Sequence, residues 1–191
     1  MAAPTPQQTP VLIVGSGSAG LCAAVWLARL GVPYTMLERR DGPLRIGQAD
    51  GVQCRTVEIF ESFGLSAALL EEAYHVLEVA FWTADAGDDE AAAPEKGASG
   101  GIRRTRFAAD TEPGLSHLPH VILNQARLNA LLIEDIERHG AGAGPSIEYG
   151  CEVTDVRIDG DVDDPEGYPV CVTSRKDGET KVYRAKYVLV G

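Results

Sequence analysis

The sequence predicts an α/β fold that opens with a strand–helix–strand unit, and three observations support this prediction. The apolar run Val11–Val14 has the composition of a buried β-strand and leads directly into a glycine-rich turn. Apolar residues then recur at helical spacing over residues 18–30, and Gly31 ends that helix. A second apolar run over residues 34–38 has the length of a strand, so the three elements form a parallel βαβ unit.

The spacing of the glycines indicates a dinucleotide site. Gly15 permits a tight turn, Gly17 lets the backbone approach a pyrophosphate, and Gly20 lets the helix pack closely on the strand. The helix N-terminus adds free N–H groups and a positive dipole end. Glu38, 18 residues after Gly20, stands where a carboxylate accepts hydrogen bonds from an adenosine ribose. The alternative is a glycine-rich turn without a ligand. We expect the whole turn to contact the dinucleotide: Gly15, Ser16, Gly17, Ser18, Ala19 and Gly20.

Further along the chain, the pattern predicts more helices and then an antiparallel β-meander. Helices are expected over residues 53–63, 66–73 and 124–139, and strands over residues 76–83, 102–107, 146–158, 168–175 and 181–190. Asp177-Gly178 predicts a hairpin turn between the last two strands. The final apolar run, Tyr187–Val190, reads as a strand buried on both faces. The expected fold is a Rossmann-like α/β domain with a meander, incomplete at the C-terminus.

Composition narrows the function classes. The 191 residues carry a net charge of −11, which argues against a nucleic-acid or anionic-membrane surface. The longest apolar stretches are too short to span a membrane, and the four cysteines lack metal-ligand spacing. We therefore expect a cytoplasmic protein without a metal. Residues 1–9 are expected to form a disordered leader, residues 84–101 a flexible insertion, and residues 10–191 a single, partial domain.

Two further motifs resemble a known family. They are Gly47-Gln48-Ala49-Asp50-Gly51-Val52-Gln53-Cys54-Arg55-Thr56-Val57-Glu58-Ile59-Phe60-Glu61-Ser62-Phe63-Gly64 and Leu118-Pro119-His120-Val121-Ile122-Leu123-Asn124-Gln125-Ala126-Arg127-Leu128-Asn129. Together with the glycine turn, they resemble the class A (single-component) FAD-dependent aromatic hydroxylases, in particular the phenol 2-monooxygenase group. The resemblance implies that residues 10–191 form part of an FAD-binding domain, with residues 75–122 an excursion toward a substrate domain.

The resemblance also implies roles for individual residues. The glycine turn would cradle the FAD pyrophosphate, Glu38 would bind the adenosine ribose, and Arg39 would lie beside it. Gln125 would reach the flavin, and Asp50 would help to deprotonate a phenolic substrate. The stretch that would line the ribityl chain and the isoalloxazine edge is Gly47, Gln48, Ala49, Asp50 and Gly51. NAD(P)H would serve as a transient reductant, a flavin hydroperoxide would hydroxylate the ring, and a homodimer is possible.

Alternatives stay open at this point. Asp50-Gly51 on its own is also a common turn pair. The chain could be a truncated, inactive remnant that binds FAD, or another Rossmann flavoprotein of the reductase or halogenase type. Because the relatives continue for several hundred residues, we expect little phenol hydroxylation from this chain alone.

Overall fold

The computed structural model describes residues 5–84, 101–140 and 147–191. The expected flexible insertion lies almost entirely outside these residues, as do the first residues of the expected leader. The chain divides into two compact units. Unit 1 comprises Met1–Asp50 and Asn124–Gly191, and unit 2 comprises Gly51–Leu123.

Unit 1 is built on a six-stranded mixed sheet in the order β8-β2-β1-β11-β10-β9. Its strands are β1 (Gln7–Val14), β2 (Tyr34–Leu37), β8 (Ile147–Glu148), β9 (Glu152–Ile158), β10 (Val170–Lys176) and β11 (Glu179–Val190). β1 pairs in parallel with both β2 and β11, and β2 pairs in parallel with β8. β9, β10 and β11 run antiparallel to their neighbours. The βαβ unit at the start of the chain therefore forms as predicted, and β11 adds a parallel neighbour on its other side.

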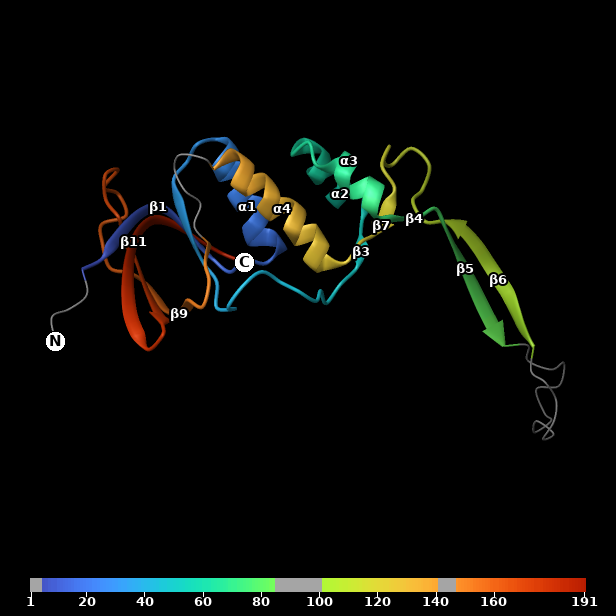
Figure 1. Ribbon diagram of the computed structural model, residues 1–191. Coiled ribbons are helices and arrows are strands. Elements are labelled where there is room, and N and C mark those ends of the chain that lie inside the picture. The colour runs from blue at the N-terminus through green and yellow to red at the C-terminus, as the bar shows by residue number, and fades with distance from the viewer. Residues whose placement is uncertain (1–4, 85–100, 141–146) are drawn as a thin grey trace, which may run out of the picture. The chain divides into compact units, whose positions relative to one another are not determined.

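Two long helices, α1 (Ser18–Arg29) and α4 (Gln125–His139), lie side by side in unit 1 (Figure 1). The Asn124 side chain caps α4 by accepting a hydrogen bond from the Ala126 N–H at 2.9 Å. A fully buried carboxylate, Asp135 of α4, accepts two hydrogen bonds from the Arg29 guanidinium of α1, at 2.7 and 2.8 Å. This bidentate ion pair fixes the two helices against each other.

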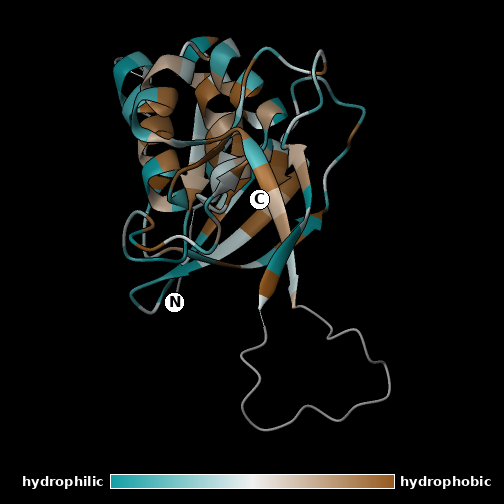
Figure 2. Ribbon diagram, turned by 90° about the vertical axis from the view of Figure 1, so that its right-hand side faces the viewer, coloured by the Kyte–Doolittle hydropathy of each residue, from teal (hydrophilic) through white to brown (hydrophobic). Residues whose placement is uncertain are grey.

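The core of unit 1 lies on its central strands. In Figure 2, the coiled ribbons of the helices carry both brown hydrophobic and teal hydrophilic segments. The buried cluster consists of Leu12, Leu37, Cys151, Val172, Tyr183 and Ala185. The alternating side chains of β1, β2, β10 and β11 supply most of it, because successive residues of a strand point to opposite faces. The helices contribute apolar stripes at the predicted spacing, including Leu21, Ala24 and Val25 of α1.

The start of β1 and the end of β11 differ from the sequence prediction. β1 begins at Gln7, inside the expected leader, because Gln7 pairs with Tyr183 in the register with β11. At the other end, Tyr187, Leu189 and Val190 are exposed, so the prediction of a strand buried on both faces is wrong there. Within the described part of unit 1, the helices α1 and α4 do not cover these side chains.

The single strand predicted over residues 146–158 is instead two strands with different partners. β8 extends the sheet beside β2, and the chain then turns at Gly150, whose φ of +69° suits glycine, to form β9 at the opposite edge. The predicted hairpin turn is confirmed. Asp177 and Gly178 have φ values of +51° and +81°, the left-handed pair that a two-residue hairpin turn requires.

Unit 2 contains the two helices predicted after the Gly47 loop, α2 (Cys54–Ser62) and α3 (Ser66–Glu72). A small antiparallel sheet, in the order β3-β7-β4, was not predicted, because its strands are only two or three residues long: β3 (Gly51–Val52), β4 (Tyr74–Val76) and β7 (His120–Ile122). The predicted strands over 76–83 and 102–107 form a separate two-stranded ribbon, β5 (Glu78–Ala84) and β6 (Ile102–Ala109).

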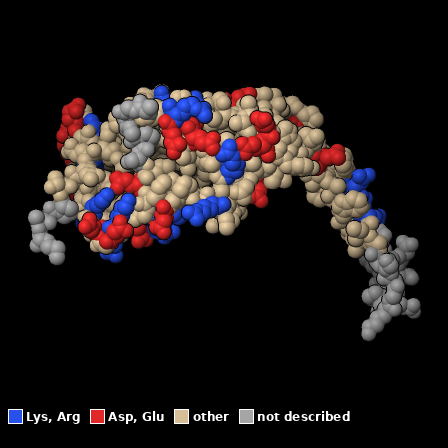
Figure 3. Space-filling model, in the orientation of Figure 1, with Lys and Arg blue, Asp and Glu red and all other residues tan. Residues whose placement is uncertain are grey.

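On the face shown in Figure 3, the positive Lys and Arg side chains are interspersed with the negative Asp and Glu side chains. None of the helices in the described ranges is both long and apolar enough to cross a lipid bilayer.

Candidate functional site

A cleft of about 520 Å³ lies in unit 1. The last residues of three adjacent strands, Val14, Leu37 and Val190, form part of its wall. Ligands of open α/β sheets bind outside the carboxyl ends of parallel strands, and the cleft has this position. The other lining residues are Gly15, Gly17, Glu38, Arg39, Arg40, Leu44, Gln48, Cys151, Glu152, Val153 and Gly191.

The glycines of the turn divide into two roles. Gly15 has a φ of +98°, and a side chain on Gly20 would collide with the Gly15 carbonyl oxygen, so these two allow the turn and the close packing of α1 on β1. At Gly17 the nearest atom to an added Cβ would be the Gly191 carbonyl carbon, 4.0 Å away. Gly17 therefore faces the open cleft, where its missing side chain leaves room for a ligand.

Glu38 lines this cleft and is buried, with 6% of its surface exposed. Its Oε2 accepts hydrogen bonds from the Ser16 N–H at 2.7 Å and the Ser16 hydroxyl at 2.8 Å. Burial by itself would raise the pKa of the Glu38 carboxyl, but the hydrogen bonds from Arg40 and Ser16 outweigh burial and lower it to about 2. The carboxylate is thus held in the charged form, in which both oxygens only accept hydrogen bonds.

The sequence reasoning missed Arg40, which is the main partner of Glu38. Its N–H and Nε donate to Oε1 at 2.8 and 3.1 Å, and its Nη2 donates to Oε2 at 2.9 Å. Arg39, the arginine named by the resemblance, lines the cleft but points outward, with 79% of its side chain exposed and Glu152 4.0 Å away. The signal for Arg40 was the arginine pair after Glu38, but the sequence alone does not say which arginine turns inward.

The loop that contains Gly47, Gln48 and Ala49 is fixed to the first turn of α4. A Cβ on Gly47 would lie 2.6 Å from the Cβ of Gln125, so the loop touches the helix directly. The Gln48 N–H donates to the Gln125 side-chain oxygen at 3.0 Å, and the Gln125 N–H donates to the Ala49 carbonyl at 3.2 Å. Gln125 thus positions the loop, and only Gln48 of this stretch lines the cleft.

Four predicted residues lie at the margins of this arrangement. Asp50 is exposed immediately after the fixed stretch, and Gly51 begins β3 in unit 2. Ser18, at the start of α1, donates to the Asn129 side-chain oxygen of α4 at 2.8 Å. The Ser18 hydroxyl therefore links the two helices, while Ala19 is exposed at the N-terminal turn of α1.

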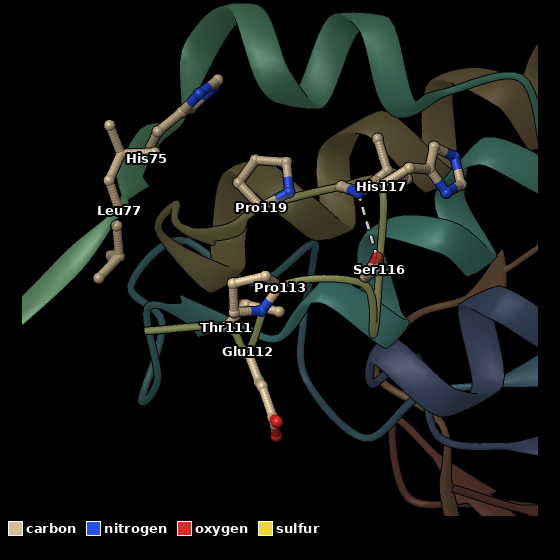
Figure 4. A pocket seen from close by; sticks show the side chains of 10 residues that line it. His75, Leu77, Thr111, Glu112, Pro113, Ser116, His117 and Pro119 are labelled. Carbon is tan, nitrogen blue, oxygen red and sulfur yellow. Dashed lines mark hydrogen bonds between the residues drawn. The ribbon is translucent and has the colours of Figure 1, made fainter. Parts of the chain in front are cut away.

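Unit 2 has a cavity of its own, of about 370 Å³ (Figure 4). The Ser116 hydroxyl in its wall accepts a hydrogen bond from the Leu118 N–H at 3.1 Å and donates to Glu58 at 2.6 Å. The His117 ring pairs with Glu61 at 3.0 Å. These polar side chains are already bonded to protein groups, so we assign no ligand to this cavity. Its lining residues are His75, Val76, Leu77, Thr111, Glu112, Pro113, Ser116, His117, Leu118 and Pro119.

An Asp–His pair in unit 2 was also missed by the sequence reasoning. The Nδ1 of His120 lies 2.9 Å from the Asp110 carboxylate, and both side chains are largely buried. Its Nε2 is buried and has no hydrogen-bond partner among the residues that the structure describes. The two residues are ten positions apart across an irregular segment, a separation that no short motif marks.

Comparison with known proteins places these features in a family. A family model described as "FAD binding domain" matches residues 8–191. The chain belongs to the FAD-binding domain family. The site residues fit this cofactor, because the cleft combines a side-chain-free approach at Gly17 with the charged acceptor Glu38.

Named relatives of this FAD-binding domain are monooxygenases. It is 49% identical over 180 residues to the FAD-dependent monooxygenase terD of Aspergillus terreus, covering 94% of this chain and 27% of the relative. It is 38% identical over 190 residues to 3-hydroxybenzoate 4-monooxygenase of Comamonas testosteroni, covering 96% of this chain and 27% of the relative. The chain thus spans about a quarter of the length of these relatives.

Solved structures show the same fold. The flavin-dependent monooxygenase PieE, in complex with FAD and substrate, matches with a TM-score of 0.72 at 24% identity, over 97% of this chain and 30% of that one. The p-nitrophenol 4-monooxygenase PnpA from Pseudomonas putida matches with a TM-score of 0.71 at 19% identity, over 97% of this chain and 41% of that one.

The two glycine roles predict that an added methyl group weakens FAD binding at Gly17 and lowers the stability of the fold at Gly20. Gly17→Ala should leave the free energy of unfolding unchanged within about 0.5 kcal/mol and weaken FAD binding, because its Cβ enters the cleft. Gly20→Ala should destabilise the fold itself by about 1–3 kcal/mol, because its Cβ meets the Gly15 carbonyl. Urea unfolding and FAD titration of both variants check this, and equal loss of stability in the two would contradict it.

The low pKa of Glu38 predicts a specific loss of stability in acid. Since folding lowers this pKa from 4.5 to about 2, the ionised carboxylate stabilises the fold above pH 4.5, and this contribution disappears as the pH falls toward 2. Glu38→Gln lacks the titrating group. The stability difference between wild type and Glu38→Gln, measured by urea unfolding at a series of pH values, should therefore shrink below pH 4.5. Parallel pH curves for the two proteins would contradict this assignment.

Proposed function

We propose that this chain forms the FAD site of an NAD(P)H-dependent monooxygenase that hydroxylates phenolic rings. Its membership of the FAD-binding domain family supports the cofactor. The relatives that are named as monooxygenases, one of them a 3-hydroxybenzoate 4-monooxygenase, support the reaction and a phenolic class of substrate. Residues 75–122 are assigned to the part of such an enzyme that approaches the substrate.

The cleft suggests how the cofactor is held. The glycine turn and the first turn of α1 would receive the pyrophosphate, because N–H groups at a helix N-terminus favour an anion. Glu38 would accept hydrogen bonds from the adenosine ribose, with Arg39 beside it. The stretch from Gly47 to Gly51 would follow the ribityl chain toward the isoalloxazine, and Gln125 would keep that stretch in place.

The anchoring of the three residues directly before Asp50 is the main support for the proposal. Gly47, Gln48 and Ala49 are held on α4 by close packing and by hydrogen bonds at 3.0 and 3.2 Å. The exposed carboxylate of Asp50 follows this anchored stretch directly. A carboxylate in a merely connecting turn would need no such support.

The chemistry explains why a carboxylate suits this position. When bound and reduced by NAD(P)H, FAD would activate molecular oxygen, so that one oxygen atom is delivered to the ring as an electrophile and the other leaves as water. A phenolate ring is far more electron-rich than a phenol ring, so removal of the hydroxyl proton favours the transfer. We assign to the Asp50 carboxylate the task of accepting a hydrogen bond from the substrate hydroxyl and drawing its proton away.

The proposal predicts that Asp50→Asn impairs turnover and spares the cofactor. The amide keeps the size of the carboxylate but cannot accept the proton, so kcat should fall on the order of 100-fold or more. The Kd for FAD, followed by the flavin absorbance near 450 nm, should change by less than about twofold. The assay is NAD(P)H-dependent formation of hydroxylated product from phenol and 3-hydroxybenzoate, by an active enzyme that contains this chain.

Asp41→Asn is the matched control, because Asp41 is an exposed aspartate of the same loop and does not line the FAD cleft. It should leave kcat and FAD binding unchanged. An Asp50→Asn enzyme with wild-type turnover would refute the role of Asp50 in removing the substrate proton. A chain that retains no flavin, once FAD has been added and the unbound FAD removed, would refute the cofactor site itself.

A further inference from the structure

We propose that the Arg40 guanidinium is a placeholder for the adenosine ribose, holding the Glu38 carboxylate until FAD displaces it. This inference rests on the proposed function, because it takes the ribose to be the ligand of Glu38. The sequence motifs did not single out Arg40, and its displacement from Glu38 adds a step to FAD binding.

The geometry of the ion pair matches that of a ribose diol. Arg40 binds the carboxylate through two donors, Nε to Oε1 at 3.1 Å and Nη2 to Oε2 at 2.9 Å. A ribose offers two neighbouring hydroxyl groups, and these can donate to the two carboxylate oxygens in the same bidentate way. The guanidinium and the diol are therefore alternative occupants of one acceptor.

The carboxylate has no free capacity for an additional ligand. It accepts five hydrogen bonds, which come from the Ser16 N–H and hydroxyl, the Arg40 N–H, and the Arg40 Nε and Nη2. A carboxylate offers about four lone-pair positions. The Ser16 N–H and the Arg40 N–H belong to the backbone that follows β1 and β2, so they stay in place. A ribose must therefore replace side-chain donors, and the guanidinium supplies two of them.

The burial of Glu38 explains why a placeholder is needed. An ionised carboxylate that is 6% exposed loses most of its hydration, so an unpaired charge there would be costly. The Arg40 guanidinium compensates that charge in the ligand-free protein. Its side chain lines the cleft and is 37% exposed, and its other hydrogen bonds, to the Ser16 carbonyl and hydroxyl, are long at 3.3 Å, so it can leave toward solvent. FAD binding then has to break an existing ion pair, and this lowers the net affinity.

The test is Arg40→Met, which keeps a long side chain and removes both donors. We expect FAD to bind about five- to tenfold more tightly than to wild type at neutral pH, because no ion pair has to be broken. The ligand-free variant should melt at a lower temperature, since Glu38 has lost its partner. Arg45→Met is the charge-matched control, because Arg45 is an exposed arginine of the same loop and does not line the FAD cleft. It should leave both quantities at their wild-type values.

Isothermal titration with FAD and thermal melting of the same samples give the readouts. Tighter FAD binding by Arg40→Met than by Arg45→Met supports the placeholder. Equal or weaker binding overturns it, because Arg40 would then hold the cofactor or merely orient Glu38. If Arg40→Met does not fold, Arg40→Lys replaces it. Lysine keeps the charge but not the bidentate contact, so it should bind FAD about two- to threefold more tightly than wild type, and unchanged or weaker binding overturns the proposal.

Glu38→Gln separates this inference from the function on which it rests. If Glu38→Gln binds FAD as well as wild type does, Glu38 is not the ribose acceptor and the site assignment fails. If Glu38→Gln weakens FAD binding about tenfold or more while Arg40→Met does not tighten it, the assignment stands and the placeholder alone is refuted.

Discussion

The buried Glu38 carboxylate joins the ends of two strands, β1 and β2, that line the cleft of unit 1. Its side chain accepts hydrogen bonds from the backbone N–H of Ser16, after β1, and from that of Arg40, after β2. Its own N–H donates to the Glu148 carbonyl at 2.9 Å, and its carbonyl accepts from the Cys151 N–H at 2.8 Å. One residue thus ties three chain segments together. The same charge that organises these segments is the acceptor proposed for the ribose.

The second constraint is the first turn of α4, which orders the loop from Gly47 to Ala49. This contact joins residues almost 80 positions apart in the chain, as the Gln48–Gln125 hydrogen bond shows. Asn129, also on α4, accepts a hydrogen bond from the Ser18 hydroxyl at the start of α1. The helix α4 therefore contacts both the end of the glycine turn and the loop from Gly47 to Ala49. In the proposed enzyme, one helix would thereby set the spacing between the pyrophosphate end of FAD and the catalytic Asp50.

The sequence was informative where local chemistry decides the structure. The three glycines and Glu38 belong to one βαβ unit, and their spacing was enough to predict that unit. Asp177-Gly178 forms a turn whose backbone conformation few residues adopt, so the residue types alone predicted the turn. It failed where long-range pairing decides. Residues 146–158 read as one strand, because nothing local shows that β8 and β9 belong to opposite edges of the sheet. Similarly, neighbouring arginines after Glu38 look alike in sequence, and only the fold directs Arg40 inward and Arg39 outward.

We expect this chain to bind the adenosine diphosphate half of FAD in the cleft that Glu38 lines. The decisive measurement is a competition experiment in which FAD binding to the chain is followed by isothermal titration in the presence of ADP or of FMN. ADP should compete with FAD at far lower concentrations than FMN does, because the proposed site would hold the ribose and pyrophosphate next to the adenine. Displacement of FAD by FMN but not by ADP would contradict it.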